Sequence, residues 1–195
     1  MNPEPGLAMS KPAQIKGISF TNVKSFVLER YEQAGWDELL GTLDADDRRT
    51  LGAAVPVGWY DLALYARVIA ALEKCHGDGD PKFLESFGRY DAARDLDGVL
   101  RLFFRVFDPG FLVTQTMKLW SRFFDTGTWV VERHGHQVVG TLTDWGIVDR
   151  GLCQSLVGYI SVLLATGRGG RGARVEHVRC RANGHPACVF TGTWE

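Results

Sequence analysis

The sequence predicts an α+β fold, with a helical N-terminal part followed by a small antiparallel sheet built as hairpin–helix–hairpin. Two observations lead to this prediction. Apolar residues recur at the three- and four-residue spacing of amphipathic helices through most of residues 17–125. Further on, short runs of β-branched and aromatic residues are bounded by glycine-containing breaks and interrupted by one more helical stretch. Helices followed by a separate antiparallel sheet are typical of the α+β class.

The helical part is expected to open with a helix that Asn22 caps and Gly35 stops. A short helix should follow over residues 36–43, and Asp61 should cap a third helix that ends at His76. Three more helices are predicted over residues 81–95, 98–107 and 109–124, the last opened by a proline in its first turn.

The sheet part is expected to contain two hairpins. The first pairs residues 128–133 with residues 137–145 around a His-Gly-His break. A helix over residues 150–165 follows, with one apolar face. The second hairpin pairs residues 173–180 with residues 188–194 across a turn that contains Asn-Gly.

Length and composition favour a single globular domain. The 195 residues are 45% hydrophobic and 23% charged, which is enough to form a hydrophobic core. Residues 1–16 are Pro-rich and weakly patterned, so we expect a flexible N-terminal segment there. One ligand-binding domain is then expected over residues 17–195.

The formal net charge of -1 provides no overall field that would attract polyanions. We therefore expect neither nucleic acid nor a membrane as a partner. No signal peptide is visible, and the longest mainly apolar stretch, residues 156–165, is shorter than the roughly 20 residues that a membrane span needs. A cytoplasmic location is expected, and thiols stay reduced there.

Three of the four cysteines lie in the C-terminal part of the chain. Cys180 and Cys188 flank the turn of the second predicted hairpin, so both thiols should meet at one end of the sheet. Cys153 lies near the start of the preceding helix, where the helix N-terminus favours a thiolate. Zinc binds about four nitrogen, sulfur or oxygen ligands in a tetrahedron. The spacing indicates a metal site, with buried free thiols or a Cys180–Cys188 disulfide as the alternatives.

The fourth ligand is open between Glu176, His177 and His185. Side chains alternate along a strand, so parity places Glu176 on the face of Cys180. The same parity turns His177 away, unless the strand ends or bulges between them.

The segment over residues 180–190, Cys-Arg-Ala-Asn-Gly-His-Pro-Ala-Cys-Val-Phe, resembles the closing signature of the 4-vinyl reductase domain. Residues 153–159, with a cysteine and a Gly-Tyr pair, are similar to the same family. This domain occurs in the sensory halves of phenol- and toluene-responsive activators and in proteins linked to bacteriochlorophyll synthesis. In the sensors it holds zinc through three cysteines and an acidic residue three positions before the second cysteine. That position is His177 here, a departure from the pattern.

The resemblance implies a structural Zn2+ held by Cys153, His177, Cys180 and Cys188. Four protein ligands leave no open position for water, so a non-enzymatic role is expected. By the same resemblance, the domain should bind a small hydrophobic or aromatic ligand and act through a protein partner or as a homodimer.

The expected ligand pocket lies between the sheet and the helices and is lined by aromatic side chains, although such residues are more often plain core. Its predicted residues are Phe107, Phe111, Trp120, Phe124, Trp129 and Trp145.

Residues 16–31 and the later Trp59-Tyr60 pair resemble an uncharacterised family abundant in myxobacteria. That family belongs to a broad fold group with haem–nitric oxide sensors and TRAPP vesicle-tethering subunits. Two alternative functions follow: a non-catalytic scaffold of TRAPP-like fold, and a tetrapyrrole-related enzyme or haem sensor. A haem sensor needs a placed axial ligand, usually histidine. His76, His134 and His136 all lie near glycines at predicted turns, and the Tyr-x-Ser-x-Arg motif of the gas sensors is not found.

Overall fold

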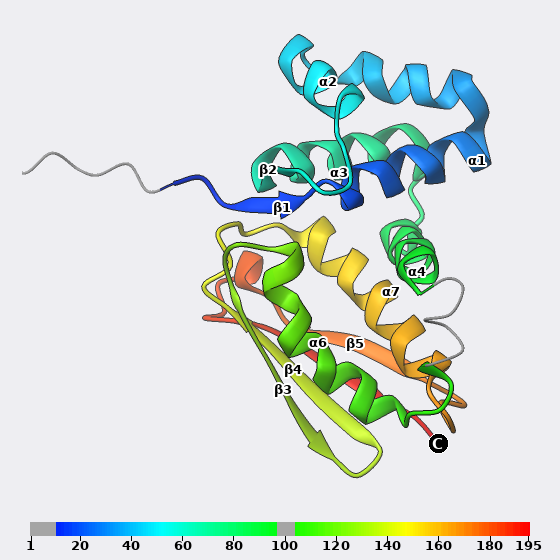
Figure 1. The fold of residues 1–195 in the computed structure, drawn as a ribbon, viewed down its shortest axis with the longest axis vertical. Helices are drawn as coiled ribbons and strands as arrows, with labels where there is room; N and C mark the ends of the chain where they lie inside the picture. Colours follow the sequence, from blue (N-terminus) through cyan, green and yellow to red (C-terminus); the bar gives the residue numbers. More distant parts are fainter. Residues whose placement is uncertain (1–10, 97–103) are drawn as a thin grey trace, which may run out of the picture.

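The structure, a computed structural model, describes residues 11–96 and 104–195 and has the predicted α+β architecture. Figure 1 shows the early helices on one side of helix α7 and the main sheet on the other. The helices are α1 (Ile18–Thr42), α2 (Ala45–Gly52), α3 (Leu62–His76), α4 (Phe83–Asp95), α6 (Pro109–Phe123) and α7 (Arg150–Thr166). The strands are β1 (Gln14–Lys16), β2 (Trp59–Asp61), β3 (Thr128–His134), β4 (Gln137–Thr143), β5 (Arg174–Arg179) and β6 (Cys188–Thr193).

The range labelled α1 contains two helical segments, as the sequence predicts. The break between them lies at Glu32, whose backbone takes φ 58° and ψ -162°, three residues before the predicted stop at Gly35. Asn22 does not cap the first segment. Its side chain is 5% exposed, and its amide donates hydrogen bonds to Asp91 and Asp95 of α4. The local capping preference of asparagine was overridden by a tertiary contact between helices.

The predicted cap of α3 and the predicted first-turn proline of α6 are confirmed. Asp61 accepts a hydrogen bond from the backbone N–H of Ala63 at the start of α3. Pro109 occupies the first turn of α6, and Asp108, which was not predicted as a cap, accepts a hydrogen bond from the backbone N–H of Phe111 there. The predicted helix over residues 98–107 lies mostly outside the described residues.

Residues 14–16, which were expected to belong to a flexible lead-in, form strand β1. This strand pairs antiparallel with β2, and Ile15 at its centre is 1% exposed. Burial of this one apolar side chain and pairing with β2 outweigh the weak pattern of the surrounding sequence.

The main sheet is antiparallel with strand order β3-β4-β6-β5. Both predicted hairpins are present, and the pairing of β4 with β6 joins them. Helix α6 packs against β3, and α7 packs against β5 and β6. The C-terminal hairpin therefore lies directly under α7.

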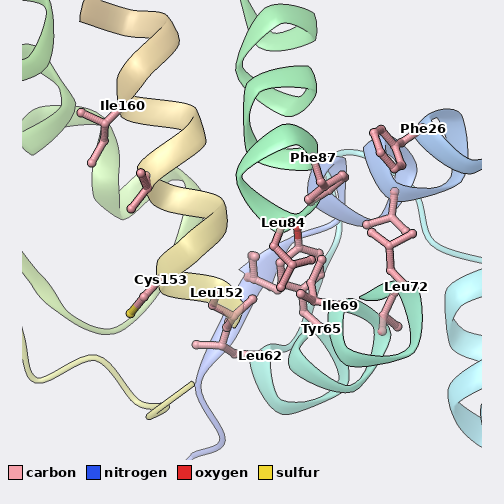
Figure 2. Close-up of a cluster of buried hydrophobic side chains, with 14 of the residues drawn as sticks. Phe26, Leu62, Tyr65, Ile69, Leu72, Leu84, Phe87, Leu152, Cys153 and Ile160 are labelled. Carbon is pink, nitrogen blue, oxygen red and sulfur yellow. The ribbon is translucent and has the colours of Figure 1, made fainter. Parts of the chain in front are cut away.

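Helices α4 and α7 cross in backbone contact, because two glycines face the partner helix. A Cβ atom added at Gly88 would lie 1.9 Å from the carbonyl oxygen of Ser155, and one added at Gly158 would lie 1.9 Å from that of Glu85. The crossing builds one continuous core with α1 and α3 (Figure 2), which includes Phe26, Leu62, Ile69, Leu72, Leu84, Phe87, Leu152 and Ile160. Among the described helices, none is long and apolar enough to cross a bilayer.

Candidate functional site

Four potential metal ligands converge between α7 and the C-terminal hairpin. Cys153, His177, Cys180 and Cys188 each offer one donor atom, and these four atoms all lie within 4.8 Å of one another. The set is the one expected from the sequence. The three cysteines are 1–4% exposed, so the group is shielded from bulk water.

Helix α7 contributes Cys153 from its first turn. Asp149 caps this helix by accepting a hydrogen bond of 2.8 Å from the backbone N–H of Leu152. Consecutive helical residues point in different directions, and Figure 2 shows the sulfur of Cys153 directed away from the core that Leu152 enters. One helical turn therefore serves both the core and the thiol cluster.

The turn after β5 brings the other two cysteines together. Cys180 precedes a short 3-10 helix, Arg181–Asn183, and Gly184 then reverses the chain with a φ of 84°. The carbonyl oxygen of Cys180 accepts hydrogen bonds from the backbone N–H groups of Asn183 and His185. The backbone N–H of Arg181 also points at the sulfur of Cys188, at 3.4 Å. Such contacts hold the two thiols in place and stabilise negative charge on sulfur.

His177 reaches the cluster because the register of β5 against β6 shifts between His177 and Arg179. This irregularity supplies the bulge that strand parity required. The imidazole stacks on Phe190, with ring centroids 4.5 Å apart. Its Nε2 atom is buried without a hydrogen-bond partner among the described residues. Burial lowers the pKa of His177, which favours the neutral imidazole that metals bind.

The other two possible fourth ligands, Glu176 and His185, are both exposed and stand outside the four-residue group. Of the three alternatives that the sequence left open, His177 is the one whose donor atom lies with the thiols.

The cysteines are free thiols, and the Sγ atoms of Cys153 and Cys188 lie 3.6 Å apart. Burial and the neighbouring thiol of Cys188 raise the pKa of Cys153, which disfavours a reactive nucleophile in the metal-free protein. For metal–sulfur bonds of about 2.3 Å, tetrahedral angles place two sulfur atoms about 3.8 Å apart. The sulfur separation therefore suits a shared ion.

A second feature is a cavity of about 50 Å³ between the early helices and the C-terminal half. Its apolar and aromatic walls come from five elements or their flanks. They comprise Ile15, Tyr65, Phe124, Trp145, Leu152, Leu156 and Tyr159.

The six predicted pocket aromatics separate into two groups. Phe124 and Trp145 line the cavity, and Trp120 stacks on Phe124 with ring centroids 4.4 Å apart. Trp129 packs behind Trp120 at 6.0 Å. The remaining two, Phe107 and Phe111, stack on each other, and neither lines the cavity.

The polar side of this cavity was missed from sequence. Ser19, Asp91, Ser155 and the hydroxyl-bearing Tyr65 and Tyr159 line it. A signal was present: Asp91 and Asp95 interrupt the α4 stripe that carries Leu84 and Phe87, at the same helical spacing. Two carboxylates on an otherwise buried face point to a polar contact within the fold.

No protein-family model matches the chain, and no curated protein matches it. Solved structures do share its fold. An H-NOX protein from Shewanella oneidensis in the Fe(II)NO ligation state gives a TM-score of 0.69 at 15% identity, over 93% of this chain and 99% of that one. An unliganded Fe(II) H-NOX protein from K. algicida gives 0.67 at 13% identity, over 93% and 97% of the two chains.

These comparisons correct two expectations. The resemblance to the 4-vinyl reductase domain was wrong as a family assignment, because the structures that match almost the whole chain are H-NOX domains, a different family. The prediction of structural zinc as the cofactor is contradicted with it, since the matching structures are described as Fe(II) proteins. Short cysteine motifs at a hairpin turn recur by geometry, and here they did not identify the family.

Proposed function

We propose that this protein is a small-molecule-binding domain of H-NOX-like fold that carries a metal ion in a centre of three cysteines and one histidine. The observation that carries the proposal is the convergence of four donor atoms within 4.8 Å of one another. Soft thiolate and imidazole ligands select thiophilic transition-metal ions. Because four protein donors leave no open coordination position, the proposed role is binding rather than catalysis.

Haem, which the descriptions of two fold neighbours name, needs an axial ligand, usually histidine. All five histidines lie in the described ranges, and none lines the cavity between the two halves. That cavity, about 50 Å³, is far below the roughly 300–1,000 Å³ of ordinary ligand pockets. A larger surface groove of about 440 Å³ beside α2 also has no histidine on its walls. The described residues therefore do not fit haem.

The same volume argues against the aromatic ligand expected from sequence. Trp120, Phe124, Trp129 and Trp145 pack on one another, with ring centroids between 4.4 and 6.0 Å apart. Their rings occupy the space that an aromatic guest would need. The ligand we propose is therefore a molecule of only a few non-hydrogen atoms.

A hydrogen bond links the turn that carries the proposed metal ligands to a residue that lines the cavity. The Arg181 guanidinium, in the turn between Cys180 and Cys188, donates a hydrogen bond of 2.6 Å to the carbonyl oxygen of Trp145. The side chain of Trp145 lines the cavity. A guest that shifts Trp145 would thus act on the metal-binding turn, and this is the route by which we propose that binding is signalled to a protein partner or a second copy of the chain.

Native mass spectrometry with elemental analysis tests the metal proposal on protein purified without added metal. We expect one equivalent of metal per chain, and Cys188→Ser should retain well under half. Cys75→Ser is the matched control, because Cys75 lies in α3, outside the four-residue group. A wild-type protein free of metal, or equal loss in both variants, would contradict the proposal.

Self-association is tested separately by sedimentation velocity at tens of micromolar protein. A twofold dimer is expected, and a species that stays near the 21.7 kDa of one chain would exclude it.

A further inference from the structure

The cavity between the two halves has the composition of a cation site. Four aromatic residues, Tyr65, Phe124, Trp145 and Tyr159, line it, and so does the acidic residue Asp91. Aromatic faces attract organic cations, most strongly where water is excluded. A carboxylate supplies the opposite charge and a hydrogen-bond acceptor for an ammonium group.

Among the described residues, the hydrogen-bond donors to Asp91 and to its neighbour Asp95 are neutral groups. The amide of Asn22 donates to Asp91 at 2.5 Å and to Asp95 at 3.2 Å, and the hydroxyl of Tyr159 donates to Asp95 at 3.0 Å. Within the described parts of the chain, Asp91 forms no ion pair, and nearby Arg94 pairs with Glu29 instead. Burial and the charge of Asp95 raise the pKa of Asp91 to about 8. No cation among the described residues is paired with Asp91.

A second polar group at this cavity points to a ligand independently. Trp145 lines the cavity and is 3% exposed, yet its indole N–H has no hydrogen-bond partner among residues 11–96 and 104–195. Buried donors are nearly always paired, so such an N–H needs an acceptor that the described residues do not provide.

We propose that this cavity binds a small primary ammonium ion that also carries a hydroxyl group, an amino alcohol of the size of 2-aminoethanol. As the ammonium group binds, the carboxyl group of Asp91 releases its proton to water. The ammonium group then donates a hydrogen bond to the Asp91 carboxylate and lies against the aromatic rings. Its hydroxyl oxygen accepts a hydrogen bond from the indole N–H of Trp145. The inference rests on the proposed small-molecule-binding function and names the class of its ligand.

The cavity size sets the upper limit for the guest. About 10–15 Å³ of such volume holds one water-sized group, so a cavity of about 50 Å³ admits roughly three to five non-hydrogen atoms. Ligands this small reach dissociation constants no tighter than tens of micromolar. Millimolar titrations are therefore required.

Isothermal titration calorimetry on the full-length, metal-loaded protein at pH 7 tests the proposal with three matched probes. We expect 2-aminoethanol to bind most tightly. Ethylammonium, which lacks the hydroxyl, should bind roughly three- to tenfold more weakly, as expected for one lost hydrogen bond. Ethylene glycol, which lacks the charge, should bind at least about tenfold more weakly.

Two variants locate the site. Asp91→Asn should weaken 2-aminoethanol binding at least about tenfold, whereas the exposed Asp46→Asn should leave it unchanged. Trp145→Phe should remove the advantage of 2-aminoethanol over ethylammonium. If that variant does not fold, the comparison of the two amines on wild type tests the same hydrogen bond.

Equal binding of ethylene glycol and 2-aminoethanol, unchanged affinity in Asp91→Asn, or no amine binding at tens of millimolar would overturn the amino alcohol assignment. Metal content measured on the same samples separates this failure from failure of the proposed function. If the protein holds one equivalent of metal but binds no amine, only the proposed ligand class is wrong, and the proposed metal centre stands.

Discussion

The Sγ atom of Cys153 lies 3.6 Å from that of Cys188, although 35 positions of sequence separate them. One thiol belongs to the first turn of α7 and the other to the first residue of β6. A metal ion between them would fasten the helix that forms the centre of the fold to the C-terminal hairpin. The first prediction follows from this geometry.

Removal of the metal should loosen the C-terminal unit before the early helices. Structural metal sites in small domains contribute roughly 10–16 kcal/mol. The gain here should be smaller, because this chain also has a large core. Hydrogen exchange with and without a chelator should show lost protection over residues 174–193, with α3 unchanged. Unaltered exchange of β5 and β6 in demetallated protein would remove the fastening role.

The second prediction concerns the fourth ligand. His177→Ala should weaken metal binding by more than about tenfold, because it removes a ligand whose Nε2 is otherwise buried and unpaired. Glu176→Ala and His185→Ala, at exposed positions on either side of Cys180, are the matched controls and should change the affinity little. Competition with a chromophoric chelator measures all three. Metal lost only in a control variant would show that the ligand set is wrong.

The glycine contact between α4 and α7 gives the third prediction. Gly158→Ala should lower the free energy of unfolding by about 1–3 kcal/mol or more, because the added Cβ meets the backbone of Glu85. Each kcal/mol corresponds to roughly 2–4 °C in melting temperature for a chain of this size. Gly41→Ala, a helical site with nothing within 4 Å, should instead stabilise by about 0.5–1 kcal/mol. Thermal unfolding of the two variants side by side measures the contrast, and equal melting temperatures would contradict the close crossing.

The fourth prediction is a pH dependence of stability that comes from Asp91. Its pKa is about 8 in the folded protein and 3.8 in an unperturbed aspartate, so the folded state holds the proton through this window while the unfolded state has released it. The free energy of unfolding therefore falls as the pH rises from about 4 to 8. One pKa unit corresponds to about 1.4 kcal/mol, and we expect a total loss of only about 1–3 kcal/mol because Asp91 is partly exposed.

Asp91→Asn should remove much of the decrease in the free energy of unfolding with rising pH. This variant should be more stable than wild type at pH 8, although it binds the amine less well. Asp95 on α4 titrates with Asp91, and Tyr65 on α3, Tyr159 on α7 and the neutral Asn22 on α1 are the other groups that face the pair. Part of the pH dependence of the free energy of unfolding should therefore remain in Asp91→Asn. Urea unfolding of both proteins at pH 5, 6.5 and 8 is the measurement, and parallel curves would show that Asp91 is ionised throughout.

The sequence sufficed for the α+β class, for most element positions and for the convergence of the thiol group, because helical periodicity and the spacing of Cys180 and Cys188 are local signals. It did not suffice for Asn22. An asparagine near a helix start looks like a cap until the carboxylates of α4, far away in the chain, are brought beside it. The cavity could not be predicted for the same reason, because its polar walls come from α1, α3, α4 and α7, which are far apart in the sequence. The family assignment failed because a cysteine turn constrains a hairpin and not the rest of the fold.

The ion's coordination shell tests the central claim most directly. X-ray absorption at the edge of whichever metal elemental analysis finds in the purified protein should show three sulfur neighbours and one nitrogen neighbour. The sulfur count should fall in Cys188→Ser and stay at three in Cys75→Ser. A shell of oxygen and nitrogen alone, or one that does not change in Cys188→Ser, would contradict a metal centre built from Cys153, His177, Cys180 and Cys188.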